Sequence, residues 1–186
     1  MKIVTTPMCQ EILHLAGVSK FQLSNSGFYG NADIVILLSE TKTHNNSGIK
    51  FIKLKLNTFS QINKSINMVS DLLGTEPLNE PEDRQVIASL EEFYHGRGPE
   101  NRKIKVKVYS NFLEEIVKDM GFTVVAGNNY DFMVYPDYMK EKLKEEIAFA
   151  GERAIELPSH KNTPLNPIKR AKMRYQILEN SLCMKH

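Results

Sequence analysis

The 186-residue chain contains no tryptophan, only two cysteines and no long apolar run. Its longest uninterrupted apolar stretch is Ile34–Leu38, whereas a membrane-spanning helix needs about 20 such residues. Cys9 and Cys183 lie near opposite ends of the sequence and form no CxxC pair, which excludes a disulfide scaffold and argues against a structural zinc site. Gln10 and Glu11 interrupt the apolar segment that a signal peptide would need. We therefore predict a cytoplasmic protein without a membrane segment.

The sequence also lacks both common phosphate-binding motifs, because neither GxxxxGK nor GxGxxG occurs in it. We interpret the basic loop His95–Gly98, which precedes Arg102 and Lys103, as a solvent-exposed connector. The five histidines are scattered, and His14 lies on a different helix face from Cys9, so local sequence predicts no histidine-based metal site. These patterns identify no cofactor.

Hydrophobic residues make up 41% of the chain and charged residues 25%, which is typical of a globular protein. The net charge of +2 is unevenly distributed. Residues 76–100 contain seven acidic residues against two arginines, whereas residues 159–186 contain six basic residues against one glutamate. This gradient indicates either a polar partner for the basic segment or a contribution to solubility.

The order strand, helix, strand is predicted twice. Residues 2–39 contain KIVTT, PMCQEILHLAGV and DIVILL, and residues 103–137 contain KIKVKVYS, NFLEEIVKDMGF and DFMVY. With Gly17 aligned on Gly121, the matching pairs are Val4 with Val108, Glu11 with Glu115, Ile12 with Ile116, and Leu13 with Val117. A shorter loop in the second copy brings Asp33 onto Asp131. Two such units usually pack with a crevice between them.

Alternating strands and helices predict an α/β fold in which two similar, Rossmann-like β-α-β units form a mostly parallel or mixed sheet with helices on both faces. Residues 49–56, IKFIKLKL, alternate apolar residues with lysines, which is typical of an exposed edge strand. An alternative is an α+β sandwich in which the lysine-rich strand runs antiparallel. Residues 58–74 have helical spacing, and Asp137 is predicted to cap a further helix.

These patterns divide the chain into a first α/β half over 1–75, an acidic helical connector over 76–100, a second α/β half over 101–158, and a basic linker with a C-terminal helix over 159–186. In that helix the apolar residues at helical spacing are Ile168, Ala171, Tyr175, Leu178 and Leu182. Such an amphipathic basic helix either packs on the core or docks on a partner. Its candidate partner-binding residues are Lys169, Arg170, Lys172, Arg174 and Tyr175.

Cys9 is the candidate nucleophile or metal ligand. Thr6 is predicted to cap the first helix and Pro7 to begin it, which places Cys9 in the first helical turn beyond the first strand. Free backbone N–H groups at that position lower the pKa of a thiol, and ligands of open α/β sheets bind beyond the same strand ends. The alternative is that Cys9 is a small buried core residue.

Ser110 and Asn111 occupy the equivalent turn of the second copy, where they are suited to binding a ligand and equally to capping the helix. Glu40 and Asp137 follow the two matching strands, and paired carboxylates suit metal binding or general acid–base chemistry. The ligand-binding candidates are therefore Thr6, Cys9, Ser110, Asn111, Glu40 and Asp137. We expect both turns to face one crevice.

The segments KIVTTPMC…EILHLAG and NPIKRAKMRY…LCMKH resemble conserved, functionally unassigned proteins of methanogenic archaea. Some proteins of that group are accessory to the maturation or activation of methyl-coenzyme M reductase. The resemblance implies an anaerobic, cytoplasmic setting and a role in an assembly. It assigns no catalytic residue.

Three hypotheses from different classes follow. The first is a non-enzymatic accessory or assembly protein of a larger archaeal complex, linked by the resemblance to methyl-coenzyme M reductase maturation and docking through its basic C-terminal helix. The second is a cysteine-dependent enzyme, or a carrier of a metal or cofactor, that uses Cys9. The third is a nucleic-acid-binding protein, although neither an aromatic RNA-binding signature nor a zinc finger occurs in the sequence. We favour the first.

Overall fold

The computed structural model describes residues 1–25, 27, 29–43, 48–78, 85, 87–89, 92 and 98–182. The chain divides into two compact units: unit 1 comprises Met1–Ile87 and Leu165–Ile168, and unit 2 comprises Ala88–Pro164 and the residues from Lys169 onward. Most of the predicted acidic connector, the loop around His95, and Cys183 lie outside the described residues.

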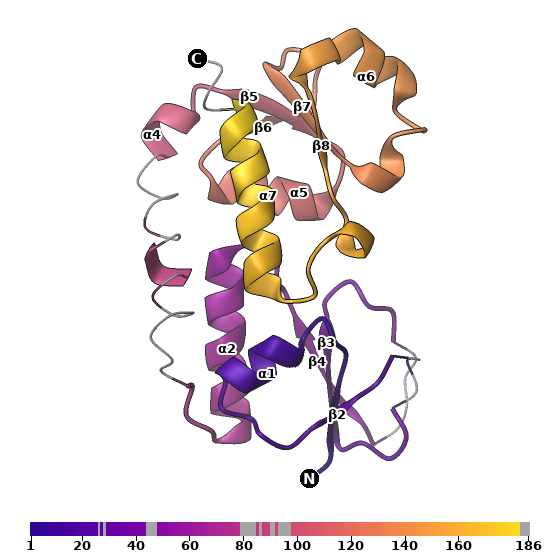
Figure 1. The fold of residues 1–186 in the computed structure, drawn as a ribbon, viewed down its shortest axis with the longest axis vertical. Helices are drawn as coiled ribbons and strands as arrows, with labels where there is room; N and C mark the ends of the chain where they lie inside the picture. Colours follow the sequence, from indigo (N-terminus) through magenta and orange to yellow (C-terminus); the bar gives the residue numbers. More distant parts are fainter. Residues whose placement is uncertain are drawn as a thin grey trace. The chain divides into compact units, whose positions relative to one another are not determined.

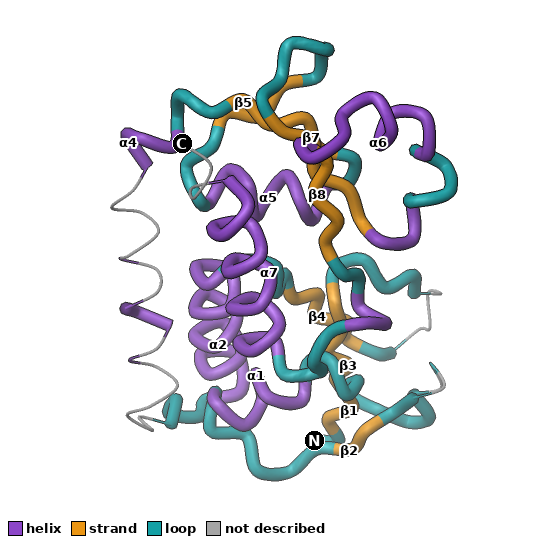
Figure 2. Tube along the Cα trace, turned by 45° about the horizontal axis from the view of Figure 1, so that its top comes forward, coloured by secondary structure: helices purple, strands orange, loops and turns teal. Residues whose placement is uncertain are grey.

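Unit 1 contains a parallel four-stranded sheet, sheet A, with the strand order β2-β1-β3-β4 among its described residues (Figure 1). Its strands are β1 (Ile3–Thr5), β2 (Gln22–Leu23), β3 (Ile34–Leu38) and β4 (Lys50–Leu54). Strand β3 is apolar and buried along its whole length, as expected of an interior strand of a parallel sheet. The helices α1 (Gln10–Leu15) and α2 (Phe59–Leu73) lie side by side on one side of this sheet (Figure 2).

Helix α2 begins and ends at residues whose chemistry explains its limits. The Thr58 hydroxyl accepts a hydrogen bond from the Gln61 backbone N–H at 3.2 Å, and the Gln61 side chain accepts one from the Thr58 N–H, which together form a capping box. Gly74 ends the helix with a φ of 64°, a conformation that costs glycine little. The predicted helix over 58–74 is thus confirmed.

The opposite face of sheet A is covered by loops. Its buried residues form a small aliphatic cluster on which three partly buried residues pack, and the cluster and its cover comprise Val4, Ala32, Val35 and Leu37, with Tyr29, Ile49 and Phe51. The rings of Tyr29 and Phe51 meet edge to face, with their centroids 5.8 Å apart.

Unit 2 contains a second parallel four-stranded sheet, sheet B, with the order β6-β5-β7-β8 among its described residues. Its strands are β5 (Lys105–Val108), β6 (Thr123–Val125), β7 (Phe132–Pro136) and β8 (Ala154–Leu157). The helices that accompany it are α4 (Gly98–Asn101), α5 (Asn111–Asp119), α6 (Lys144–Ala150), α7 (Pro167–Leu182), and the short 3-10 helices η1 (Asp137–Met139), η2 (Gly151–Arg153) and η3 (His160–Asn162). The first two residues of α7 belong to unit 1 and the rest of the helix to unit 2. Helices α5 and α6 lie on opposite sides of sheet B (Figure 1).

These observations confirm the predicted α/β fold with two similar β-α-β units. Strand β4 is an edge strand, as its lysine pattern predicts, but it runs parallel to β3, so the antiparallel alternative is wrong. Strand β5 also carries alternate lysines and is nevertheless interior. The helix predicted to start at Asp137 is divided into η1 and α6.

The predicted repeat is present, but the alignment of its first strands, β1 with β5, differs from the predicted alignment. The Asp33 carboxylate accepts a hydrogen bond from the Lys2 N–H at 2.5 Å, and the Asp131 carboxylate accepts one from the Lys105 N–H at 2.7 Å. These two contacts make Lys2 equivalent to Lys105. The segment from this lysine to the glycine after the first helix is therefore one residue longer in unit 2, where it runs from Lys105 to Gly121, than in unit 1, where it runs from Lys2 to Gly17.

The corrected register changes which residues match. Val4 pairs with Val35 across β1 and β3, and Lys107 pairs with Met133 across β5 and β7. The counterpart of Val4 is therefore Lys107, and the predicted match with Val108 is wrong. Successive side chains of a strand point to opposite faces of its sheet. The shift of one residue therefore places Lys107, rather than Val108, on the face of sheet B that matches the face of Val4 in sheet A.

Within the described part of the chain, no helix has the length and apolar character needed to cross a membrane.

Candidate functional site

In unit 1 the first strand-to-helix turn encloses its cysteine. Cys9 is fully buried, and its N–H donates to the Thr6 carbonyl at 3.0 Å. Cys9 is the N-cap of α1, so the helix begins after it and the predicted start at Thr6 and Pro7 is wrong. Burial in this turn agrees with the alternative interpretation of Cys9 as a small core residue.

Thr6, a second candidate, is half-buried in the same turn. The third candidate in unit 1 is Glu40, which lies two residues after the end of β3 and is exposed. Its role as a ligand residue stays a prediction, and so does the crevice that both turns were expected to face. The remaining candidates, Ser110, Asn111 and Asp137, belong to unit 2.

In unit 2 a polar residue follows closely after each of three neighbouring strands. Strands β5, β7 and β8 are adjacent and parallel, and soon after their carboxyl ends come Ser110, Asp137 and Ser159. The carboxyl ends of parallel strands are where open α/β sheets bind their ligands. We call this set, together with Asn111 and Asn162, the carboxyl-edge cluster.

Asp137 is the most connected member of the carboxyl-edge cluster. One carboxylate oxygen accepts from the Asn162 amide at 2.7 Å and the other accepts from the Tyr138 N–H at 2.8 Å. Burial acts to raise the pKa of Asp137, but hydrogen bonds from Ser159, Asn162 and the Tyr138 backbone outweigh it and hold that pKa below 3.8. Asp137 is therefore ionised at neutral pH and ties the end of β7 to the segment after β8.

Ser110 and Asn111 begin helix α5. Ser110 is the N-cap, but its hydroxyl makes no capping hydrogen bond. Among the described residues that hydroxyl is buried and has no hydrogen-bond partner, whereas Asn111 is exposed. A buried hydroxyl without a partner is rare, because a polar group that is removed from water normally finds one.

The predicted partner-binding residues are divided between the surface and the core. Lys169 and Lys172 are exposed, but Arg170, Arg174 and Tyr175 are almost fully buried. These three residues are therefore not available to a partner in this structure. The expectation that Arg170 and Arg174 lie on an outer face is wrong, whereas Tyr175 belongs to the predicted apolar stripe, which is buried.

Local contacts explain why the two arginines turn inward. The Arg170 guanidinium donates to the Pro164 carbonyl at 3.0 Å, and Arg174 donates to the Pro158 carbonyl at 3.1 Å while stacking 4.8 Å from the Phe112 ring centroid. Arginine suits such positions because its flat, weakly hydrated group combines stacking with hydrogen bonding. The Tyr175 hydroxyl donates to the Asp119 carboxylate at 2.5 Å.

A second group of polar residues, which sequence reasoning missed, lies on the α6 side of sheet B. The Lys107 ammonium is 3.1 Å from a Glu146 carboxylate oxygen and 3.3 Å from the Asn128 side-chain oxygen. The Tyr109 hydroxyl donates to the same Glu146 oxygen. Lys107 also lies 5.2 Å and 5.7 Å from the ring centroids of Tyr109 and Tyr130, within cation–π range.

The electrostatics of this group favour an ion pair with a neutral phenol. Hydrogen bonds from Tyr109 and Lys107 lower the pKa of the Glu146 carboxyl. The hydrogen bond with Tyr109 raises the pKa of Lys107 against the effect of burial, and burial together with the Glu146 contact raises the pKa of Tyr109. At neutral pH the group therefore holds one ammonium, one carboxylate and one protonated phenol.

A similar trio lies further along the same sheet. The Glu156 carboxylate accepts from the Tyr135 hydroxyl at 3.3 Å and is 2.8 Å from the Lys140 ammonium. Burial is the largest cause of the raised pKa of Tyr135. Both trios belong to the surroundings of the apolar cluster under α6, whose buried members are Tyr130, Met133, Tyr135, Leu143 and Ala150.

With the corrected alignment of β1 and β5, the sequence contains one signal for the group formed by Lys107, Tyr109 and Glu146. The predicted alignment matches Val4 with Val108, which hides the exchange of an aliphatic core residue for Lys107. Glu146 has no local signal, because it comes from α6 and meets β5 only in the folded unit.

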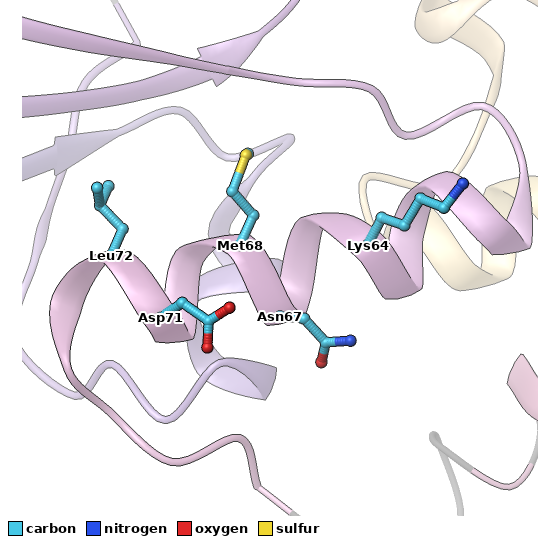
Figure 3. A pocket seen from close by; sticks show the side chains of 5 residues that line it. All are labelled: Lys64, Asn67, Met68, Asp71 and Leu72. Carbon is cyan, nitrogen blue, oxygen red and sulfur yellow. The ribbon is translucent and has the colours of Figure 1, made fainter.

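The described residues hold no group of three histidine, cysteine, aspartate or glutamate side chains arranged to bind a metal ion. An open depression does lie on helix α2, lined by Lys64, Asn67, Met68, Asp71 and Leu72 (Figure 3). Met68 and Leu72 are 42% and 40% exposed there. Because these side chains come from one helix, they form a surface feature rather than an enclosing site.

No protein-family model matches the chain, and no curated protein has a similar sequence. Solved structures do share its fold. The laminin-binding adhesin Lmb of Streptococcus agalactiae has a TM-score of 0.63 at 12% identity, with 98% of this chain and 99% of that chain covered. A zinc-bound variant of AdcAII from Streptococcus pneumoniae has a TM-score of 0.56 at 13% identity, with the same coverage.

A nitrogenase chain is also similar, with a TM-score of 0.58 at 13% identity; the match covers 99% of this chain and 60% of that one. At such low identities the likeness establishes the fold alone. An adhesin, a zinc-bound protein and a nitrogenase share it, so the function has to be argued from the residues of this chain.

Proposed function

We propose that this chain is a non-enzymatic binding protein, and that it holds a small polar ligand at the carboxyl-edge cluster of unit 2. The observation that carries the proposal is that three adjacent parallel strands are each followed closely by a polar residue, and that one of these, Ser110, has a hydroxyl that is buried without a partner among the described residues. The burial of Cys9 supports a binding role over a cysteine-dependent one.

Native mass spectrometry of the full chain, purified anaerobically under mild conditions, tests this proposal. We expect a non-covalent adduct on the 21.3 kDa protein that is lost on denaturation. The adduct should be depleted in Ser110→Ala and retained in Ser89→Ala, a control that removes an exposed hydroxyl of the same unit. An adduct that both variants retain, or no adduct at all, would contradict the proposal.

The binding protein is further proposed to act as an accessory or assembly factor in a larger complex. The resemblance of both chain ends to proteins of methanogenic archaea supports a link to methyl-coenzyme M reductase maturation. Because Arg170 and Arg174 are buried, the docking surface on α7 reduces to Lys169 and Lys172.

Deleting the C-terminal segment is a poor test of docking, because α7 buries Ile168, Tyr175 and Leu178 and its loss would unfold the core. Exchanging Lys169 and Lys172 for glutamate is better, because both side chains are exposed. We expect the double variant to lose co-purification with the reductase complex at an unchanged melting temperature. Exchange of Lys142 and Lys144, also exposed and in unit 2, is the matched control.

A second candidate function is that of a metal carrier. It is favoured by the zinc-bound AdcAII structure and by YcdH of Bacillus subtilis, described as a metal-dependent lipoprotein, whose TM-score is 0.57 at 12% identity. Against it, no three metal-binding side chains gather within the described residues. Metal analysis of the anaerobically purified protein separates the two, since a carrier should hold about one metal ion per chain. Nucleic-acid binding stays a prediction, for which steep salt dependence is the test.

A further inference from the structure

The Lys107 ammonium occupies a place where a folded core alone would not need it. Its counterpart Val4 is 4% exposed and packs in an aliphatic cluster, whereas the Lys107 side chain is 17% exposed. Even a paired charge that is largely removed from water is often no more stabilising than an apolar residue, so stability alone does not explain the lysine. The exchange therefore suggests that this face of sheet B binds something.

In this group the two donors, Lys107 and Tyr109, come from a paired strand and its continuation, whereas the acceptor, Glu146, comes from a short helix. Lys107 lies in β5, an interior strand paired on both sides. Tyr109 follows β5 directly, and its N–H continues the pairing with β7 by donating to the Val134 carbonyl at 3.2 Å. Glu146 comes from α6, a seven-residue helix without a side-chain cap, and it is 46% exposed. The strand forms a fixed pair of donors, and the helix brings a carboxylate to it.

The surroundings fit an anion larger than one carboxylate. Arg153 lies 5.5 Å from the Tyr130 ring centroid, and Lys107 lies 5.7 Å from the same centroid. Two cations therefore lie within cation–π range of one aromatic ring. Cations, a phenol hydroxyl and aromatic edges are groups that recognise small organic acids.

We propose that Lys107 and Tyr109 form a binding site for a small dicarboxylate, and that Glu146 occupies this site as an internal competitor until the dicarboxylate displaces it. One ligand carboxylate takes the two hydrogen bonds that Glu146 now accepts, and the second pairs with Arg153. This site is on the α6 side of sheet B and is independent of the carboxyl-edge cluster.

An internal competitor weakens the apparent affinity by the fraction of time that it leaves the site open. A competitor that leaves the site open for no more than about a tenth of the time lowers the affinity at least about tenfold, so its removal should strengthen binding by at least that factor. Removing the donors should have the opposite effect.

Succinate is the probe, titrated by calorimetry into the full-length protein, with 1,4-butanediol as its uncharged counterpart. We expect Glu146→Ala to bind succinate at least about tenfold more tightly than the unmodified chain, and neither protein to bind the diol. Glu145→Ala removes the adjacent exposed carboxylate of the same helix and should leave the affinity unchanged. Adding Lys107→Met to Glu146→Ala should abolish binding.

Two further measurements keep the test decisive. If the Lys107 variant fails to fold, Tyr109→Phe in the Glu146→Ala background keeps the ring, removes one donor and should weaken succinate binding several-fold. The protein has seven tyrosines and no tryptophan, so the tyrosine band of a near-ultraviolet difference spectrum on binding reports on phenols without an indole contribution. Equal affinities of Glu146→Ala and the unmodified chain, or binding that survives loss of the donors, would overturn the proposal.

Discussion

The matching faces of sheets A and B carry different chemistry on the same backbone. In sheet A, Val4 and Ala32 are buried in an aliphatic cluster under loops; in sheet B their counterparts are Lys107 and Tyr130, under helix α6. Features shared by both units are those that the backbone requires, such as the aspartate that accepts from the strand N–H. Features found in one unit alone are candidates for function.

The largest expected effect comes from moving the charge into unit 1. Val4→Lys places an ammonium in a cluster with no acidic member, so we expect a loss of about 3–5 kcal/mol in the free energy of unfolding. Urea denaturation measures it, with Val4→Met as a control of comparable length and no charge. If Val4→Lys costs no more than Val4→Met, the two faces tolerate charge equally and the comparison fails.

Next in size is a backbone feature that both units share. Gly17 has a φ of 76° and Gly121 a φ of 85° after their first helices. A Cβ at Gly17 would also lie 2.1 Å from the Glu76 carbonyl oxygen, so we expect Gly17→Ala to cost about 2–4 kcal/mol, more than the roughly 1–2 kcal/mol of the left-handed conformation alone.

Gly74→Ala is the matched control for Gly17→Ala. It has a φ of 64° and no atom within 4 Å of an added Cβ, so it should cost only about 1 kcal/mol. Equal losses of stability for the two variants in urea denaturation would show that the backbone at residue 76 moves away from the added Cβ without a measurable loss in the free energy of unfolding.

The shared aspartates should matter equally. Asp33→Ala and Asp131→Ala each remove a hydrogen bond to the N–H of an equivalent lysine, at exposed positions, and we expect about 1 kcal/mol for each. Thermal unfolding of the two variants is the measurement. A difference of more than about 1 kcal/mol between them would mean that the two units do not use this contact in the same way.

A smaller effect is expected from Lys107→Val, which makes sheet B resemble sheet A. The substitution removes one partner of a partly exposed ion pair, and Glu146 is exposed enough to hydrate, so the change in stability should stay within about 1 kcal/mol. Hydrogen exchange of α6 should nevertheless become faster, because the helix loses its tie to β5. A large global loss would show that Lys107 is required for folding.

The smallest effect is a local response to pH. The pKa of Glu146 lies below its ordinary value of 4.5, so its stabilising contribution is present above that pH and is lost as the pH falls through the lowered value. We expect α6 amides to exchange faster in that range, while the amides of α1 do not respond. An equal response of both helices would assign the change to general acid unfolding.

Much of the fold could be predicted from the sequence, because the residues that repeat are ones that the backbone conformation requires. Gly17 and Gly121 adopt positive φ, and Asp33 and Asp131 make equivalent contacts, so their spacing reveals two units. The strands β2, β6 and β8 were missed because they have only two to four residues and, unlike β1, no uninterrupted run of buried residues.

The candidate sites were harder to predict, for physical reasons that particular residues illustrate. Arg174 has the charge of a surface residue, but a proline carbonyl and an aromatic ring bury it. Lys107 was not singled out, because its partner Glu146 is distant in the sequence and meets it only in the folded unit. Long-range pairing of this kind leaves no periodic pattern.

The position of α7 in the chain also has a consequence for protein synthesis. Its residues Arg174 and Tyr175 contact Phe112 and Asp119 of α5, yet α7 follows every strand of unit 2 in the sequence. A ribosome that has completed β8 has therefore not yet supplied the helix that covers α5. The nascent chain should be a substrate for chaperones and proteases until residues 167–182 emerge, so translation pauses before that point would lower the yield of folded protein.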